Sequence, residues 1–91
     1  MKYKVLFSDD ALEDLRRLQR NEPQSYRKVQ AFIVELSEHP RTGTGHPEQL
    51  KGVPKGRWSR QITKKHRMVY QIFDNDVVVL VLSSYGHYDD K

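Results

Sequence analysis

The chain has 91 residues, which is enough for one domain with a modest core and too few for a second domain. It contains no cysteine, which excludes a disulfide framework and cysteine-based metal or thiol chemistry. Its 16 Lys and Arg outnumber its 12 Asp and Glu, and the net charge of +4 favours an acidic partner such as nucleic acid.

No segment of the sequence suits a membrane. The longest apolar run, residues 77–82, is far shorter than the roughly 20 residues that a membrane-spanning helix needs. No signal-peptide pattern opens the chain, because its first residues lead directly into an alternating segment. We therefore expect a cytoplasmic protein.

The first third of the chain predicts one strand and one helix. Residues 2–7 place apolar side chains at every second position, which indicates a half-buried strand. Ser8 then stands where a helix N-cap belongs, and two aspartates follow in the first turn, where carboxylates suit the positive end of a helix. We expect this helix to end near Asn21.

A second helix is predicted after Pro23, a residue that fits a first helical turn. It ends at His39, because the residue before a proline is pushed out of helical geometry. Its apolar stripe, expected to face the core, consists of Tyr26, Val29, Phe32, Ile33 and Leu36.

The second half predicts a long loop and three strands. Residues 41–57 form a loop rich in Gly, Pro and Thr, and residues 57–62, 66–73 and 77–84 indicate strands joined by short turns. We expect one α+β domain over residues 1–91, with the order β-α-α-β-β-β. In it, two N-terminal helices pack on one face of a small antiparallel sheet and leave the other face open for chemistry.

The stretch from Gly43 to Tyr70 carries the chemical signal. Glu48 is an isolated carboxylate that could act as a general base on a polyanion drawn to this basic field. The alternative without a catalytic role is that Glu48 is a solvated loop carboxylate paired with Lys51. The cations around Glu48 are Lys51, Lys55, Arg57, Arg60, Lys64, Lys65 and Arg67.

Two further groups could complete a site. Arg67 lies within an otherwise apolar strand, so its side chain must reach water or meet an anion. His87 and Tyr88 follow the last strand, where the histidine could serve as a proton donor if it is held in place. The alternatives are an exposed arginine on a solvated face and a frayed terminus.

Other kinds of site have weaker support. Ligand-type side chains occur at His46, Glu48, His66 and His87, but their spacing matches no recognised metal site. The serines stand in no nucleophile-elbow pattern. A plain RNA-binding module would need stacking aromatics among the basic residues, and Trp58 alone offers one.

Four motifs in this order resemble the YoeB/Txe toxins of the RelE superfamily, over nearly the whole chain. They are the segments Pro47–Lys51, Trp58–Ile62 and His66–Tyr70 and the pair His87-Tyr88. The resemblance implies a toxin of a bacterial type II toxin–antitoxin pair that cleaves messenger RNA in the ribosomal A site. It also implies a YefM/Axe-like antitoxin as partner, contact with the ribosome and mRNA, a homodimer and no cofactor.

The resemblance also assigns roles to individual residues. Glu48 is expected to be the general base, His87 the general acid, and Arg67 the group that stabilises the cleaving phosphate, with Tyr88 assisting. No metal ligand is expected. The expected RNA-binding residues are Lys51, Trp58, Arg60, Gln61, Lys64 and Lys65.

Two departures from the family and one competing function stand beside this reading. Gln61 occupies a position where the family commonly has a second arginine, and Asp89-Asp90-Lys91 extends the chain past the usual His-Tyr end. The same superfamily fold also includes toxins that inhibit DNA gyrase by binding it, and these have no need of the Glu48, Arg67 and His87 set.

Overall fold

The computed structural model describes residues 2–51 and 55–84. The observed bounds lie within two residues of each predicted helix and strand. In chain order the elements are β1 (Lys4–Phe7), α1 (Asp9–Asn21), α2 (Pro23–Glu38), β2 (Glu48–Gln49), β3 (Arg57–Gln61), β4 (Arg67–Phe73) and β5 (Val78–Ser83).

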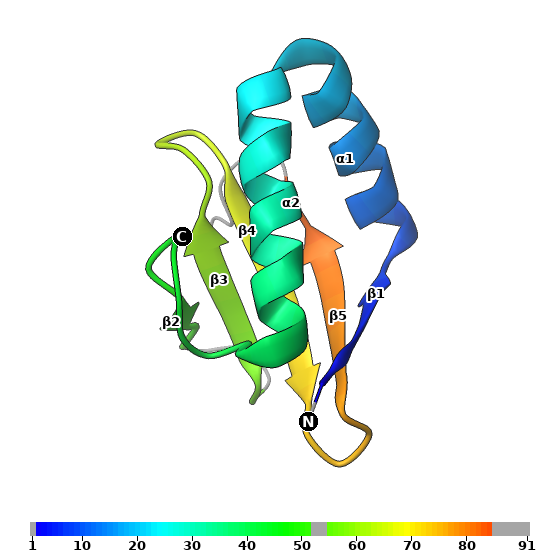
Figure 1. Cartoon of the computed structure of the whole chain (residues 1–91), viewed down its shortest axis with the longest axis vertical. Helices are drawn as coiled ribbons and strands as arrows, with labels where there is room; N and C mark the ends of the chain where they lie inside the picture. Colours follow the sequence, from blue (N-terminus) through cyan, green and yellow to red (C-terminus); the bar gives the residue numbers. More distant parts are fainter. Residues whose placement is uncertain (1, 52–54, 85–91) are drawn as a thin grey trace.

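The strands form one five-stranded sheet in the order β1-β5-β4-β3-β2. β2 to β5 pair antiparallel with their neighbours, whereas β1 pairs parallel with β5, so the sheet is mixed rather than wholly antiparallel. The two helices carry the chain from β1 toward the far edge of the sheet, and three later strands return to β1 (Figure 1). Such a crossover leaves the two neighbours pointing the same way. The very short β2 lies inside the segment predicted to be a loop.

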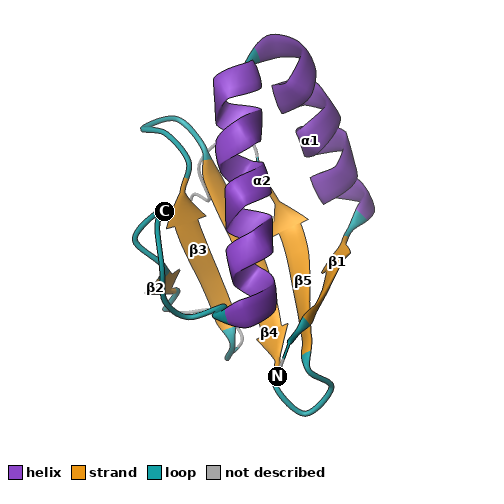
Figure 2. Ribbon diagram, viewed as in Figure 1, coloured by secondary structure: helices purple, strands orange, loops and turns teal. Residues whose placement is uncertain are grey.

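Both helices lie on the same face of the sheet, as predicted (Figure 2). Apolar side chains from the helices and from alternate sheet positions meet between the two layers, where burial removes them from water. The buried apolar residues of this core are Ala11, Leu18, Val29, Phe32, Leu36, Ile62, Met68, Tyr70, Ile72, Val79 and Val81.

The helix ends follow from local chemistry. The Ser8 hydroxyl accepts a hydrogen bond from the Ala11 N–H at 3.0 Å and donates one to the Leu82 carbonyl at 2.9 Å, so this cap also attaches α1 to β5. α2 begins with Pro23 in its first turn and ends before Pro40. The Ser8 cap therefore fixes where α1 meets the sheet.

Among the described residues, no helix lies on the second face of the sheet (Figure 1). Because side chains alternate along a strand, Arg67 lies on this open face together with Val69, Gln71 and Phe73. Phe73 is partly exposed there, as is Leu6 on β1. Within the described residues, no helix is both long and apolar enough to cross a membrane.

Candidate active site at one corner of the open face

Pairing of the strands brings three of the predicted site residues, Glu48, Gln61 and Arg67, to one corner of the sheet. Glu48 on β2 is opposite Ser59 on β3, and Ser59 in turn is opposite Val69 on β4. Gln61 is opposite Arg67, two residues along the same two strands. Side chains of directly opposite residues share a face, so Glu48, Ser59, Gln61 and Arg67 all lie on the open face.

The side chains of Glu48 and Arg67 approach each other across β3. Arg67 Nη1 lies 4.0 Å from Glu48 Oε1. The same nitrogen donates a long hydrogen bond of 3.4 Å to the Ser59 hydroxyl. Two side chains separated by 19 positions in the sequence thus meet at one corner of the sheet, and their catalytic roles remain predictions.

Both side chains of this ion pair are partly exposed to solvent. The side chain of Glu48 is 65% exposed and that of Arg67 is 32% exposed. An ion pair this long and this accessible contributes little to folding, on the order of 0–1 kcal/mol. Both side chains therefore remain partly exposed, and the contact between them is weak.

Four of the residues predicted to bind RNA are Lys51, Gln61, Lys64 and Lys65, which lie close to Glu48 or Arg67 in the chain. Lys51 is exposed and comes two residues after β2. Lys64 and Lys65 are exposed in the turn between β3 and β4, where Lys65 Nζ lies 3.6 Å from the Glu22 carboxylate. Gln61, half-buried, is the cross-strand neighbour of Arg67. Their RNA contacts remain predictions.

His87 and Tyr88, the predicted acid and its neighbour, lie outside the described residues. The described part of the chain does reach the site corner. Ser83, the last residue of β5, is opposite Val69, which is two positions from Arg67 on β4. The roles of His87 and Tyr88 therefore remain predictions.

Arg60 was predicted to bind RNA, and the structure contradicts this. Its side chain is completely buried on the helix-covered side of β3, where it forms an ion pair with Glu35. Its guanidinium also lies near the rings of Phe32 and Tyr70, 5.7 and 5.9 Å from their centroids. A group enclosed in this way cannot meet an RNA phosphate.

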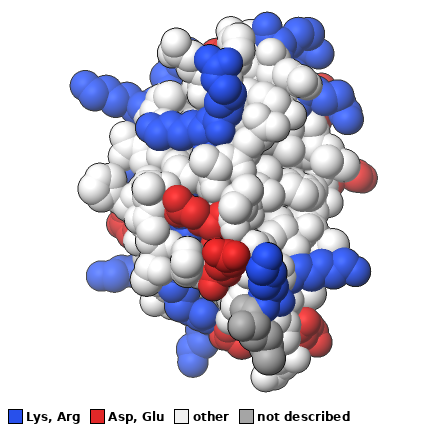
Figure 3. All heavy atoms as spheres, in the orientation of Figure 1, with Lys and Arg blue, Asp and Glu red and all other residues white. Residues whose placement is uncertain are grey.

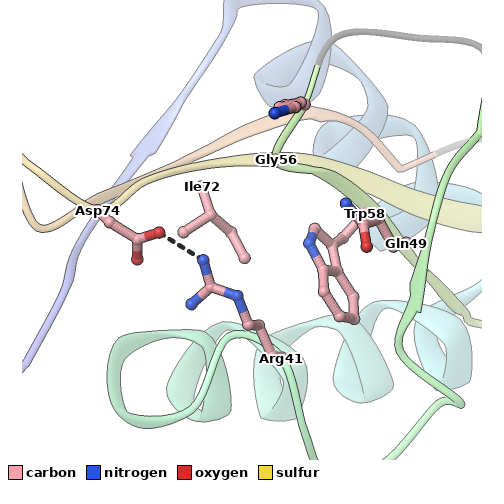
Figure 4. Close-up of a pocket in the computed structure, with 7 residues that line it drawn as sticks. Arg41, Gln49, Gly56, Trp58, Ile72 and Asp74 are labelled. Atoms are coloured by element: carbon pink, nitrogen blue, oxygen red, sulfur yellow. Dashed lines mark hydrogen bonds and ion pairs between the residues drawn. The ribbon is translucent and has the colours of Figure 1, made fainter.

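Trp58 also lies away from the Glu48–Arg67 corner. It is opposite Gln49, the neighbour of Glu48, and alternation puts both on the helix-covered side. Its half-buried ring lines an open pocket of about 480 Å³ in which Arg41 and Asp74 form an ion pair at 2.6 Å (Figure 4). Trp58 therefore lies outside the Glu48–Arg67 corner, and its contact with RNA remains a prediction.

His66, a ligand-type side chain for which no metal site was predicted, lies just before β4 and contacts Glu22. His66 is buried, and its Nε2 lies 2.8 Å from Glu22 Oε2. The hydrogen bond with His66 lowers the pKa of the Glu22 carboxyl below its ordinary value. In residues 2–51 and 55–84, no three ligand-type side chains form a group suited to a metal ion.

The helix-bearing face has no continuous basic surface. Figure 3 shows lysines and arginines projecting mainly from the margins of this face, with acidic side chains near its middle.

Sequence reasoning missed two residues that shape the site. Ser59 contacts Arg67, and its position was available from the alternation of β3, which sets it on the face opposite to Arg60. Glu35 forms an ion pair with Arg60. Its position on α2 between the buried Phe32 and Leu36 could have indicated a partly buried carboxylate. A carboxylate beside a core stripe requires a partner.

Comparison with known proteins identifies the family. Residues 7–88 match the sequence profile described as YoeB-like toxin of bacterial type II toxin-antitoxin system. The chain belongs to this family. The toxin YoeB of Synechocystis is 34% identical over 85 residues, which cover 93% of this chain and 96% of that protein.

Solved structures of family members have the same fold. The YoeB dimer from Staphylococcus aureus aligns with a TM-score of 0.83 and 30% identity, covering 97% of this chain and 100% of that one. The YoeB-YefM complex from the same species aligns with a TM-score of 0.79 and 29% identity, at the same coverage of both chains. The resemblance to YoeB/Txe toxins is therefore confirmed, and this chain is a toxin of the type II class.

Proposed function

We propose that this YoeB-family toxin is an endoribonuclease that cleaves messenger RNA in the ribosomal A site and so inhibits translation. The observation that carries the proposal is the approach of Arg67 to Glu48 at 4.0 Å on an open corner of the sheet. A general base beside a cation that can neutralise a phosphate is the arrangement that RNA cleavage requires.

The proposed reaction uses a nucleophile that belongs to the RNA. Glu48 takes the proton from a ribose 2′-hydroxyl, and the 2′-oxygen attacks the adjacent phosphorus. The bond from phosphorus to the 5′-oxygen breaks, and His87 gives that oxygen a proton. The products are a 2′,3′-cyclic phosphate and a 5′-hydroxyl, so atoms and protons balance. Arg67 stabilises the charge that builds on the phosphate.

The neighbouring groups have supporting parts in this proposal. Tyr88 holds the phosphate or stacks on a base beside His87. Lys51, Lys64 and Lys65 attract the RNA backbone, and Gln61 donates one hydrogen bond beside Arg67 where the family commonly has an arginine. The modest number of groups on the toxin fits a reaction in which the ribosome positions the message.

The partners follow from the same family membership. We infer that a YefM-like antitoxin neutralises the toxin and that the free toxin forms a homodimer. The Staphylococcus aureus relatives described as a YoeB-YefM complex and as a YoeB dimer support both points. Action on ribosomes would place the toxin in the cytoplasm of its host.

Toeprinting of a translated message tests the cleavage directly. Wild-type toxin should produce cuts within the A-site codon, and Glu48→Gln should reduce single-turnover cleavage by about 10²–10⁴-fold while antitoxin binding is retained. Lys4→Gln, on the distant β1, serves as the matched control. Wild-type cleavage by Glu48→Gln would contradict the assigned base. A toxin that arrests growth without cutting any message would favour inhibition by binding, as in the gyrase inhibitors.

A modified message tests the nucleophile. A single 2′-deoxy nucleotide at the scissile position removes the attacking oxygen, so cleavage there should stop while cuts at unmodified codons continue. Cleavage that survives the substitution would instead indicate attack by water.

A further inference from the structure

Arg60 uses its whole guanidinium on its own chain. An arginine side chain has five N–H donors. The acceptors are the Tyr70 hydroxyl at 3.1 Å, the Glu35 carboxylate, and the backbone carbonyls of His39 at 3.0 Å, Thr42 at 2.8 Å and Thr44 at 3.2 Å. Each donor therefore has a partner.

Most of these partners belong to one segment, residues 39–45, which joins α2 to the approach of β2. Glu35 strengthens the same attachment, because it accepts from the Thr44 N–H at 3.0 Å and from the Thr44 hydroxyl at 2.7 Å. On the other side, the Gln61 N–H donates to the Gly45 carbonyl at 2.7 Å. The segment is thus attached both to α2 and to β3.

Two glycines let the segment lie directly against this group. Gly43 and Gly45 have φ angles of 122° and 81°, in the region that favours glycine. A Cβ at Gly45 would stand 2.5 Å from the Phe32 ring and 3.2 Å from the Arg60 Cβ. At Gly43 it would collide with the Glu35 carboxylate. The close approach therefore depends on both glycines.

Glu48 comes three residues after Gly45, where this segment ends. Among the described residues, the short strand β2 gives it few other contacts. β2 has only two residues, both exposed, at the edge of the sheet. An edge strand of this length cannot fix its own position relative to Arg67, because so few backbone hydrogen bonds hold it.

We propose that Arg60 is a positioning residue, which fixes residues 39–45 and thereby keeps Glu48 within reach of Arg67. The inference rests on the proposed function and extends it to a residue that never touches RNA. Arginine is required because its planar fork reaches carbonyls at three points of a loop together with Glu35 and Tyr70. Lysine has the same charge but only three donors on a single nitrogen.

Arg60→Lys tests the proposal, with Leu18→Ala as a control for lost stability. Leu18 is fully buried in the last turn of α1. This turn lies near the start of α2, whereas residues 39–45 follow its end (Figure 1). Both variants are assayed at a temperature where more than about nine-tenths of each is folded. We expect Arg60→Lys to lower the maximal single-turnover rate on the ribosome by at least about tenfold. The concentration for half-maximal rate should stay within about twofold, because no RNA-binding group is lost.

Native-state hydrogen exchange separates this inference from the proposed function. Arg60→Lys should speed exchange of the backbone N–H groups of Thr44 and Leu50 by at least about tenfold relative to N–H groups within α1. If exchange there is unchanged, or if Arg60→Lys and Leu18→Ala cleave equally well, the positioning role is wrong. Faster exchange in a toxin whose wild type cuts no message would leave the attachment standing and refute the nuclease.

A milder variant covers the case in which Arg60→Lys does not fold. Thr44→Val removes one exposed hydroxyl that donates to Glu35 and leaves the Arg60 hydrogen bonds in place. We expect faster exchange at Thr44 and a decrease of about threefold in the maximal rate, in line with one hydrogen bond. A Thr44→Val protein with wild-type exchange and rate would overturn the proposal.

Discussion

Arg60 and Arg67 are arginines on neighbouring strands, and the structure uses them in opposite ways. Arg60 is buried against the helices and has all five donors satisfied by its own chain. Arg67, on the open face, makes a 3.4 Å hydrogen bond to Ser59 and a 4.0 Å contact to Glu48 among the described residues. An arginine with satisfied donors holds structure together, whereas one with spare donors can bind an anion.

The same contrast governs the two carboxylate partners. Glu35 is held by Arg60 and by both the N–H and the hydroxyl of Thr44. Glu48 has the distant Arg67 as its ion-pair partner in the described part of the chain. The Arg60 pair is therefore enclosed within the fold, whereas the Arg67 pair leaves the proposed base, Glu48, largely exposed. The following predictions test this division from the largest expected effect to the smallest.

Replacing each arginine in turn by methionine should separate their contributions to the free energy of unfolding. Arg60→Met leaves Glu35 and three backbone carbonyls without their buried donor and should lower the free energy of unfolding by about 3–5 kcal/mol. Arg67→Met removes an exposed pair and should cost less than about 1 kcal/mol. Urea denaturation of both variants measures the difference. Equal losses would contradict the division.

Catalysis should respond in the reverse order. Arg67→Gln removes the charge that we propose stabilises the cleaving phosphate and should lower single-turnover cleavage by about 10²–10³-fold, at wild-type stability. Arg67→Lys keeps a point charge but loses the planar fork, so it should recover part of the rate. If Arg67→Gln cuts ribosome-bound message normally, the corner formed with Glu48 is not where the phosphate binds.

Much of this arrangement could be predicted from sequence. The caps at Ser8 and Pro23 locate the helices, and alternation along β4 correctly assigns Arg67 to the face of Val69 and Gln71. Alternation also separates Arg60 from Gln61. These are local signals, and each acts over only a few residues.

What the sequence could not supply is long-range. Alternation shows that two residues share a face but not which face the helices cover, so a charged Arg60 was expected to be exposed. Its burial depends on Glu35, which comes from another element 25 positions away. The parallel pairing of β1 with β5 is likewise set by the path of the whole chain and has no local sequence signal.

Gly45→Ala should disturb the surroundings of Arg60 without substituting either arginine. Its positive φ costs a residue with a side chain roughly 1–2 kcal/mol, and the new methyl group would press on Phe32. We expect a loss of that size in the free energy of unfolding, together with a lower cleavage rate because the segment before Glu48 shifts. Full stability in thermal denaturation would show that the segment does not need to lie against Phe32.

The smallest effect concerns pH and the partner of Arg60. Partial burial of Glu35 would raise the pKa of its carboxyl, but hydrogen bonds from Thr44 and Arg60 outweigh it, so the pKa lies below its ordinary value of 4.5. At pH values between the lowered folded pKa and the ordinary pKa, the unfolded chain therefore binds more protons than the folded chain. The stabilisation is complete above that ordinary value and is lost as the pH falls through the lower folded pKa. Urea midpoints should therefore fall on acidification from about pH 6 to about pH 3.

Glu35→Gln isolates this contribution, since the amide oxygen still accepts hydrogen bonds but no longer titrates. Its urea midpoint should fall less steeply over the same pH range. Some slope will persist, because the pKa values of Glu22 and Asp74 are also lowered, by hydrogen bonds with His66 and with Arg41 respectively. Glu22→Gln should remove a separate part of the slope, and the two reductions should add because the sites share no partner. A Glu35→Gln midpoint that follows the wild-type curve at every pH would mean that Arg60 does not depend on a charged partner.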